Sequence, residues 1–241
     1  MTGVSPERMG GDAEPTVSVI LTTFNRRELV QRAMESVQAQ VYRDWELLII
    51  DDGSTDGTAQ AILPAVLDDP RLRYHAWKNQ GLAPARNWGL AAARGTFATF
   101  LDSDDEYTPD HLGRRIGKFM LDPALDVVHG GYQIIGPEGS DMVPDMEDPT
   151  RLIPISQCIV GATLFGKTEV FRTVGGFRSV YGTDADLFQR LRARRFQIGE
   201  VTTPTYLYHR DVPDSMCDAV KAAHGSEPQA LEETPEIEFS L

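Results

Sequence analysis

The stretch VSVILTTFNRRELVQRAMESVQAQVYRDWELLIIDDGS, residues 17–54, decides the fold class of this chain. It opens with a compact run of apolar, β-branched residues at 17–21, which is typical of a buried strand. The segment 26–40 has one apolar face and one polar face, as expected of a surface helix. A second apolar run at 45–50 predicts another buried strand. A strand, a helix and a strand in this order predict two parallel strands joined by the helix.

The same alternation continues to residue 121. The sequence predicts helices at 56–67, 82–93 and 109–121, and strands at 71–77 and 96–101. Proline stands in the first turn of two of these helices, where it is tolerated. We therefore expect an α/β fold with a mixed, mostly parallel sheet and helices on both of its faces.

The second half of the chain is less regular. We expect a strand at 126–135, a surface loop rich in turn residues and acids at 136–150, and a helix at 183–195. One or two strands are expected at 198–210, where Pro204 marks a break or a sheet edge.

Composition and charge narrow the class of protein. The chain has 241 residues and a net charge of −13, which argues against a nucleic-acid binder because such a protein needs a basic face. Its two cysteines, Cys158 and Cys217, lie far apart and are interpreted as reduced thiols. Residues 1–15 lack the apolar core of a signal peptide, and no apolar run is long enough to span a bilayer. A cytoplasmic protein with no transmembrane segment is expected, and peripheral contact with a membrane is left open.

Polar clusters follow three of the predicted strands. They are TTFN at 22–25, DDGS at 51–54 and DSDD at 102–105. In open α/β sheets, ligands bind beyond the carboxyl ends of the strands, where these clusters would meet. Crowded carboxylates repel one another unless a cation lies between them. Without nearby cysteine or histidine, such a site suits Mg²⁺ or Mn²⁺, which keep open positions for substrate phosphates.

Four stretches, VSVILTTFNR, IIDDGSTDGT, NQGLAPARNWGL and FLDSDD, resemble in that order the signatures of family 2 glycosyltransferases, over roughly residues 16–212. The resemblance implies the A-type glycosyltransferase fold, a single nucleotide-diphospho-sugar transferase domain at 16–216. That domain would comprise a nucleotide-binding half at 16–106 and an acceptor half at 107–216. We expect residues 1–15 to be a disordered leader and residues 217–241 an acidic mobile tail.

The resemblance also implies an activity. It is an inverting, metal-dependent transfer of the hexosyltransferase type from a nucleoside-diphosphate sugar, with UDP-sugar expected from family habit. The acceptor would be a hydroxyl of a saccharide, a lipid-linked intermediate or a protein.

Individual roles follow where residues match the family motifs. The residues that would contact the nucleotide sugar are Thr23, Phe24, Asp51 or Asp52, Arg86, Asp102 and Arg210. Asp104 matches the direct metal ligand of the D-x-D motif, with Asp105 as its neighbouring support. His209, beside Arg210, matches a late basic element near the diphosphate and is a candidate for phosphate or metal binding.

A further match carries the catalytic assignment. GGF at 175–177 and GTDADL at 182–187 resemble the family's GGF…EDxDL segment. Thr183 replaces the usual glutamate, which puts details of acceptor binding in doubt. Asp184 matches the aspartate that serves as catalytic base, against a simpler reading as a helix N-cap. Asp186 is expected to cap the helix or to pair along it.

Two alternative functions stay open. A nucleotidyltransferase also combines an α/β sheet with metal-binding acids, but it normally needs a Gly-rich loop bearing lysine or arginine, which TTFNRREL at 22–29 lacks. A non-catalytic nucleotide- or sugar-binding module on the same fold is favoured by Thr183, whereas Asp184 and the intact D-x-D motif oppose it.

Overall fold

The computed structural model describes residues 14–212 apart from 147 and 149. The tail expected at 217–241, with Cys217, lies outside the described residues, as does nearly all of the leader expected at 1–15.

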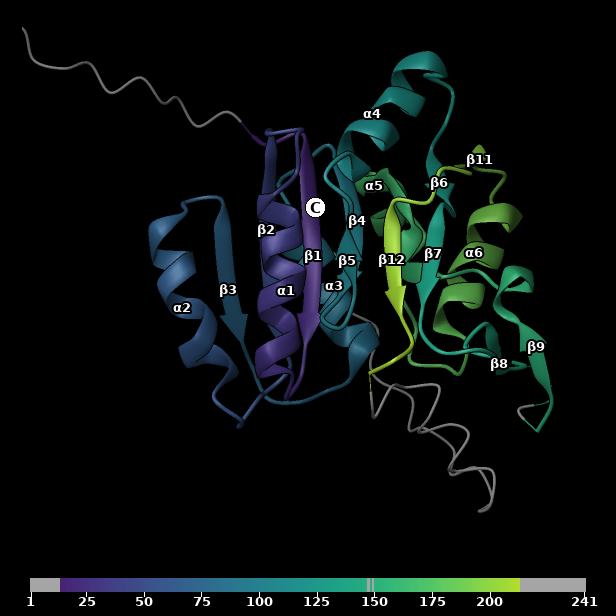
Figure 1. The fold of residues 1–241 in the computed structure, drawn as a ribbon. Helices are drawn as coiled ribbons and strands as arrows, with labels where there is room; N and C mark the ends of the chain where they lie inside the picture. Colours follow the sequence, from purple (N-terminus) through teal and green to yellow (C-terminus); the bar gives the residue numbers. More distant parts are fainter. Residues whose placement is uncertain (1–13, 147, 149, 213–241) are drawn as a thin grey trace, which may run out of the picture.

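A seven-stranded sheet forms the centre of the molecule, in the order β11-β6-β10-β4-β1-β2-β3 (Figure 1). Its strands are β1 (Val17–Thr23), β2 (Trp45–Asp51), β3 (Leu72–Ala76), β4 (Phe97–Asp102), β6 (Val127–His129), β10 (Phe165–Lys167) and β11 (Ile198–Glu200). Strands β3, β2, β1 and β4 are parallel, whereas β10 runs antiparallel to β4 and β6. The expected mixed, mostly parallel sheet is confirmed.

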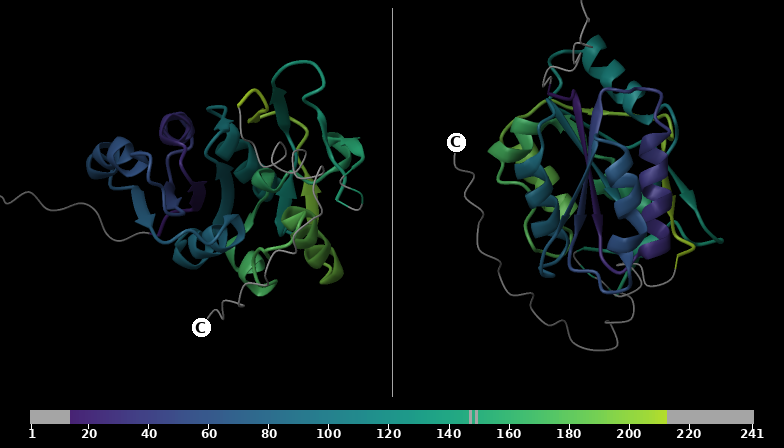
Figure 2. Two further views of the ribbon diagram at one scale, coloured as in Figure 1. Left: turned by 90° about the horizontal axis from the view of Figure 1, so that it is seen from below. Right: turned by 90° about the vertical axis from the view of Figure 1, so that its left-hand side faces the viewer.

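Helices cover both faces of this sheet (Figures 1 and 2). One face packs against α1 (Arg27–Gln38), α2 (Thr58–Asp68) and α4 (His111–Leu121), and the other against α3 (Leu82–Ala92), α5 (Thr168–Thr173) and α6 (Thr183–Ala193). Successive strand residues point to opposite faces, so Val19 and Leu21 join one apolar core and Ile20 joins the other. This explains why the central strands are apolar throughout rather than alternating.

Two smaller sheets complete the second half. Strand β12 (Tyr206–His209) runs antiparallel to β5 (Glu106–Tyr107) and parallel to β7 (Tyr132–Ile135). Strands β8 (Met142–Pro144) and β9 (Leu152–Pro154) pair with each other. Because β5 follows directly on β4, its pairing with β12 brings the end of the described chain to the end of β4.

Two of the segments expected in the second half differ in the structure. The single strand expected at 126–135 is two strands, β6 and β7, which belong to different sheets. Gly130 and Gly131 separate them, with φ of 85° and 68°, a left-handed conformation that glycine adopts without strain. The loop expected at 136–150 contains β8, so this part is an antiparallel pair rather than a loop throughout. The break expected at Pro204 is confirmed, since it lies between β11 and β12.

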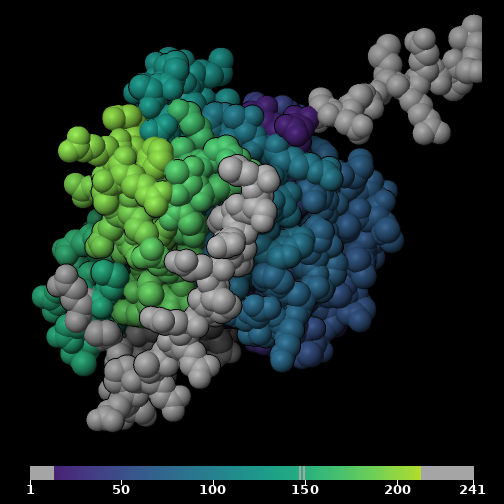
Figure 3. Space-filling model, turned by 180° about the vertical axis from the view of Figure 1, so that it is seen from behind, coloured from purple at the N-terminus to yellow at the C-terminus, as the bar shows by residue number. Residues whose placement is uncertain are grey.

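Seen from behind, residues of the first and second halves of the chain lie side by side on one surface (Figure 3). Within residues 14–212, none of the helices combines the length and the apolar character needed to cross a bilayer.

Candidate active site

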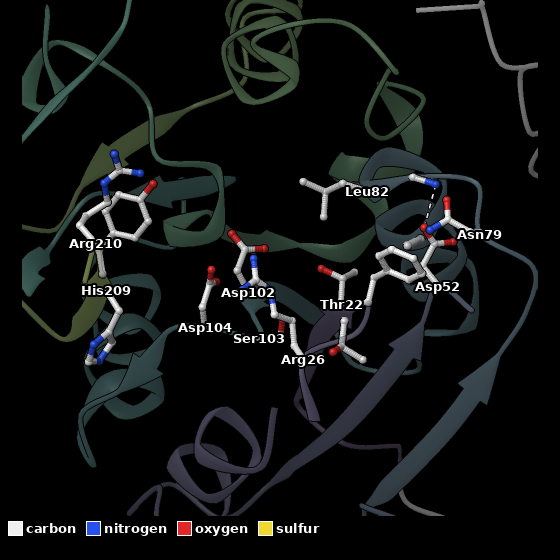
Figure 4. Close-up of a pocket in the computed structure, with 15 residues that line it drawn as sticks. Thr22, Arg26, Asp52, Asn79, Leu82, Asp102, Ser103, Asp104, His209 and Arg210 are labelled. Carbon is white, nitrogen blue, oxygen red and sulfur yellow. Dashed lines mark hydrogen bonds between the residues drawn. The ribbon is translucent and has the colours of Figure 1, made fainter. Parts of the chain in front are cut away.

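A cavity of about 350 Å³ opens at the carboxyl ends of β1 and β4 and beside the loop that follows β2 (Figure 4). Its lining comes from the three polar clusters, the start of α3 and the end of β12: Thr22, Thr23, Phe24, Arg26, Asp52, Asn79, Gly81, Leu82, Ala85, Asp102, Ser103, Asp104, Tyr208, His209 and Arg210. The strand register explains the meeting, because Thr22 lies opposite Asp102 and Thr23 opposite Asp51.

The loop after β1 holds Phe24 at the rim of this cavity. Asn25 adopts φ of 51°, a left-handed conformation that asparagine tolerates better than most residues. Its backbone N–H donates to Ser54 Oγ at 2.8 Å, and its Oδ1 accepts from the Thr55 N–H at 2.8 Å. These bonds tie the loops after β1 and β2 together. The Phe24 side chain is 45% exposed, so its ring is available for stacking.

Thr23 brings an unsatisfied polar atom to the same cavity. Among the described residues, its buried Oγ1 has no hydrogen-bond partner. Buried polar groups are rarely left unpaired, so this hydroxyl is suited to bind a ligand.

The structure distinguishes Asp51 from Asp52. Asp51 accepts hydrogen bonds from the Ser54 N–H and the Tyr74 hydroxyl at 2.8 and 2.7 Å, and it does not line the cavity. Asp52 does line it, and its carboxylate is fixed by donors from the segment that follows β3. The geometry therefore favours Asp52 for contact with a ligand.

The acids at the end of β4 and in the loop after it lie in two different surroundings. Asp102 and Asp104 line the cavity (Figure 4). Burial raises the pKa of Asp104, and the charge of Asp102 raises it further. Asp105 is fully buried and accepts hydrogen bonds from the Tyr206 hydroxyl and the His209 backbone N–H. This geometry favours a supporting role for Asp105, which holds β12 against the loop after β4, over ligation of a metal.

Arg86, on α3, lies beneath the cavity rather than in its lining. Its side chain is only 2% exposed, and it donates to Asp102 Oδ1 and to Asp184 Oδ1, each at 2.8 Å. Burial alone would lower the pKa of Arg86, but the Asp102 and Asp184 carboxylates raise it, so the guanidinium stays charged. Its Cζ lies 5.0 Å from the centre of the Phe177 ring, in range of a cation–π contact. Arg86 thus joins the end of β4 to the start of α6.

Asp184 lies in the first turn of α6, and both of its oxygens accept a hydrogen bond. Oδ1 accepts from Arg86, and Oδ2 accepts from the Gly161 N–H at 3.1 Å. Burial raises the pKa of Asp184, Arg86 lowers it and Asp102 raises it, with a net result above the usual value. The N-cap of α6 is Gly182, without a side-chain cap bond, so Asp184 is not the cap.

Two neighbours of Asp184 make contacts within their own segment of the chain. Thr183, the residue in place of the usual glutamate, donates its hydroxyl to the Arg178 carbonyl at 2.7 Å. Asp186 pairs with Arg190 one turn along the helix, as expected for a residue that pairs along it.

The opposite wall of the cavity carries His209 and Arg210 (Figure 4). His209 Nε2 lies 2.8 Å from Glu106 Oε2, and its Nδ1 lies 3.3 Å from Asp211 Oδ1. Both ring nitrogens are therefore engaged by carboxylates, and a metal-binding role for His209 stays a prediction. The Arg210 guanidinium lies 5.8 Å from the Tyr208 ring.

Several residues of the site were not predicted from the sequence. They are Trp77, Glu106, Gly161 and Tyr206, each of which holds a predicted site residue in place. Asn87 stands inside the ARN motif and exchanges two hydrogen bonds of 2.8 Å with the backbone of Phe177. Its position beside Arg86 was the available signal, but pairing with the GGF segment depends on the fold.

The donor set is compatible with a hard divalent ion. In the part of the chain that the structure describes, no three His, Cys, Asp or Glu side chains gather as a metal-binding group. Mg²⁺ and similar ions are commonly held by one or two carboxylates together with substrate phosphates. Asp104, at the cavity beside Asp102, fits such a partial site.

Comparisons with known proteins identify the family and the fold. The model of glycosyl transferase family 2 matches residues 18–197. A putative teichuronic acid biosynthesis glycosyltransferase of Bacillus subtilis is 33% identical over 140 residues, covering 58% of this chain and 55% of the relative. The chain thus spans about half the length of that relative.

Two solved structures share the fold. TarS of S. aureus in complex with UDP-GlcNAc has a TM-score of 0.66 at 19% identity, covering 85% of this chain and 60% of that one. A mannosyltransferase of Pyrobaculum calidifontis in complex with GDP-Man and Mn²⁺ has a TM-score of 0.66 at 22% identity, covering 88% and 62%. These likenesses confirm the expected fold. With a family model matched over most of its length, the chain belongs to glycosyl transferase family 2.

Proposed function

We propose that this protein is an inverting glycosyltransferase that moves a sugar from a nucleoside-diphosphate sugar to a hydroxyl acceptor. The observation that carries the proposal is one continuous arrangement of charges. Asp52, Asp102 and Asp104 line a single cavity, and Arg86 connects Asp102 to Asp184. The nucleotide base of the sugar donor would contact Phe24 and Asp52, and its diphosphate would extend toward Asp104 and Arg210.

Asp184 is the proposed general base. Its carboxylate takes the proton of the acceptor hydroxyl while the acceptor oxygen bonds to the anomeric carbon. The bond from that carbon to the diphosphate breaks at the same time, and the diphosphate leaves with the electron pair. Attack from the side opposite the leaving group inverts the configuration. Gly161 and Arg86 hold the carboxylate in one orientation for this step.

The divalent ion belongs to the proposal as a cofactor, Mg²⁺ or Mn²⁺. Asp104 would hold it, and the ion would supply positive charge to the leaving diphosphate. Arg210, which lines the same cavity, would contribute charge of the same sign.

Donor and acceptor are narrowed by what the related proteins bind or build. UDP-GlcNAc in the TarS complex supports a UDP-sugar, whereas GDP-Man in the mannosyltransferase complex supports only the wider class of nucleoside-diphosphate sugars. The name of the Bacillus subtilis relative supports a role in polysaccharide biosynthesis. A lipid-linked or protein acceptor is the other option, and the cytoplasmic location expected from the sequence is part of this proposal.

Substitution at Asp184 tests the function. Asp184→Asn should lower turnover by about 10²-fold or more while donor binding is largely kept, because an amide cannot take the proton. Transfer and donor hydrolysis would be followed with UDP- and GDP-sugars and Mn²⁺, with calorimetry for binding. Asp186→Asn is the matched control, since Asp186 lies on the same helix and pairs with Arg190.

Three outcomes would count against the proposal. Near-normal turnover of Asp184→Asn would refute the assignment of Asp184 as general base. A product with retained anomeric configuration would refute the inverting mechanism. Nucleotide-sugar binding without turnover on any acceptor would favour the non-catalytic binding module.

A further inference from the structure

The carboxylate of Asp52 is held by three donors. Its Oδ1 accepts from Trp77 Nε1 at 3.1 Å and from the Gln80 N–H at 2.8 Å, and its Oδ2 accepts from the Gly81 N–H at 2.8 Å. A carboxylate offers about four acceptor positions. The Asp52 side chain is buried yet lines the cavity, so the position left over on Oδ2 is available to a ligand.

Trp77 differs from the other two donors because it is a side chain. It follows β3, packs into the apolar core on the α3 face, and meets the Trp88 ring edge-on at 5.9 Å. A second cavity of about 230 Å³ lies beside it, lined by both tryptophans, Ile50, Tyr74, His75 and Ala76. The indole is thus fixed on one side by packing and donates to Asp52 on the other.

We propose that Trp77 is a positioning residue that selects the nucleotide base through Asp52. This inference rests on the proposed function and specifies which nucleotide the sugar donor carries at that same site. A carboxylate offers acceptors and no donor, and because Trp77 and Gln80 occupy Oδ1, the acceptor that Asp52 presents to a ligand is Oδ2. The site therefore takes a base with a ring N–H, such as uracil or guanine, and disfavours cytosine and adenine, which have a ring acceptor at that position.

Loss of the indole N–H removes one of the three hydrogen bonds that hold the Asp52 carboxylate. Without Trp77 Nε1, one position on Oδ1 loses its partner and the Asp52 side chain gains freedom to rotate. Orientation contributes to selectivity because an acceptor that is held in place discriminates between a donor and an acceptor on the base. The base preference should therefore fall more than overall affinity does.

The test compares UDP with CDP, which differ at the ring position in question. Affinities with Mg²⁺ would be measured by calorimetry for the natural protein, Trp77→Phe and Trp88→Phe. We expect the natural protein to prefer UDP, and Trp77→Phe to reduce that preference by about tenfold, the size of one hydrogen bond to a charged group. Trp88→Phe is the matched control, because Trp88 contacts the same aromatic group and no hydrogen bond to Asp52 is seen.

Asp52→Asn supplies a second variant should Trp77→Phe not fold. Its amide nitrogen would face either the Gly81 N–H or the Trp77 and Gln80 donors, so at least one of the present hydrogen bonds is lost and the preference for UDP should fall. An unchanged UDP:CDP ratio in a folded Trp77→Phe, or an equal loss in Trp88→Phe, would overturn the inference while sugar transfer by the natural protein still supports the function. Absence of nucleotide binding and of transfer in the natural protein would overturn both.

Discussion

Arg86 and Asp184 form an ion pair in which each residue controls the charge of the other. Burial raises the pKa of Asp184, whereas Arg86 lowers it. A general base works only in its ionised form, so activity should fall as the pH drops through this pKa. We predict that kcat/KM falls on the acid side (the acid limb) at a pH above the usual pKa of an aspartate. In Arg86→Gln this fall should occur at a still higher pH, because the positive charge that lowers the pKa of Asp184 is gone. The measurement is the pH–rate profile of the free enzyme.

Two further variants make this comparison specific. Arg86→Lys retains a positive charge, so its limb should lie nearer to that of the natural protein. Arg94→Gln removes a charge from an exposed side chain at the opposite end of β4 and should leave the limb in place. An acid limb at the same pH in Arg86→Gln, with the protein still folded, would contradict the assignment of Asp184 as base. Melting temperatures are needed because removal of one partner from a buried ion pair is strongly destabilising.

At the residue scale, the sequence predicted well which residues gather at the site. It predicted less well which partners each of these residues contacts. Thr23, Phe24, Asp102 and Asp104 do line the cavity, because the ends of adjacent parallel strands necessarily meet. The choice between Asp51 and Asp52 could not be made from the sequence. It depends on Tyr74, Trp77 and the backbone after β3, which the fold brings to the end of β2.

At the scale of elements, the 3-10 helix η2 (Gly161–Thr163) has a direct connection to the site. A Cβ added to Gly161 would lie 2.0 Å from Asp184 Oδ1, closer than real Cβ atoms approach. We predict that Gly161→Ala displaces the carboxylate and lowers turnover by about 10²-fold, as removal of the base would, while nucleotide affinity changes little. Steady-state kinetics and calorimetry on the same preparation would separate the two effects.

A glycine in a different setting is the control for this prediction. Gly117, within α4, has nothing within 4 Å of an added Cβ. Gly117→Ala should leave turnover unchanged and stabilise the helix by about 0.5–1 kcal/mol. Normal turnover in Gly161→Ala would show that turnover does not depend on the present position of the Asp184 carboxylate.

The same scale shows why the first half was easier to predict than the second. The strands expected up to residue 121 are continuous apolar or β-branched runs and the helices span several turns, and each was found within about two residues of its expected ends. Strand β10 has three residues, Phe165–Lys167, too few to show a period, and neither it nor α5 was predicted. The division of 126–135 into β6 and β7 depends on backbone turns at two glycines that a hydrophobic pattern does not record.

At the scale of the whole molecule, the net charge of −13 opposes the binding of any diphosphate. The cavity adds Asp52, Asp102 and Asp104 to this unfavourable field, with Arg26 and Arg210 as the cations in its lining. A divalent ion between carboxylate and phosphate reverses the local charge.

We therefore predict that removal of divalent cations with EDTA weakens UDP binding by at least about tenfold, and that Mn²⁺ or Mg²⁺ restores it. Asp104→Asn should lose most of this dependence, because its amide is a poorer ligand for a hard cation. Asp68→Asn removes one negative charge from the exposed end of α2, so it separates local ligation from the general effect of net charge. Calorimetric titration of UDP into the three proteins, each with EDTA and with Mn²⁺, gives the comparison. Equal affinity with and without the cation in the natural protein would refute the metal site. An equal change in Asp68→Asn and Asp104→Asn would show that the ion acts through net charge instead of through Asp104.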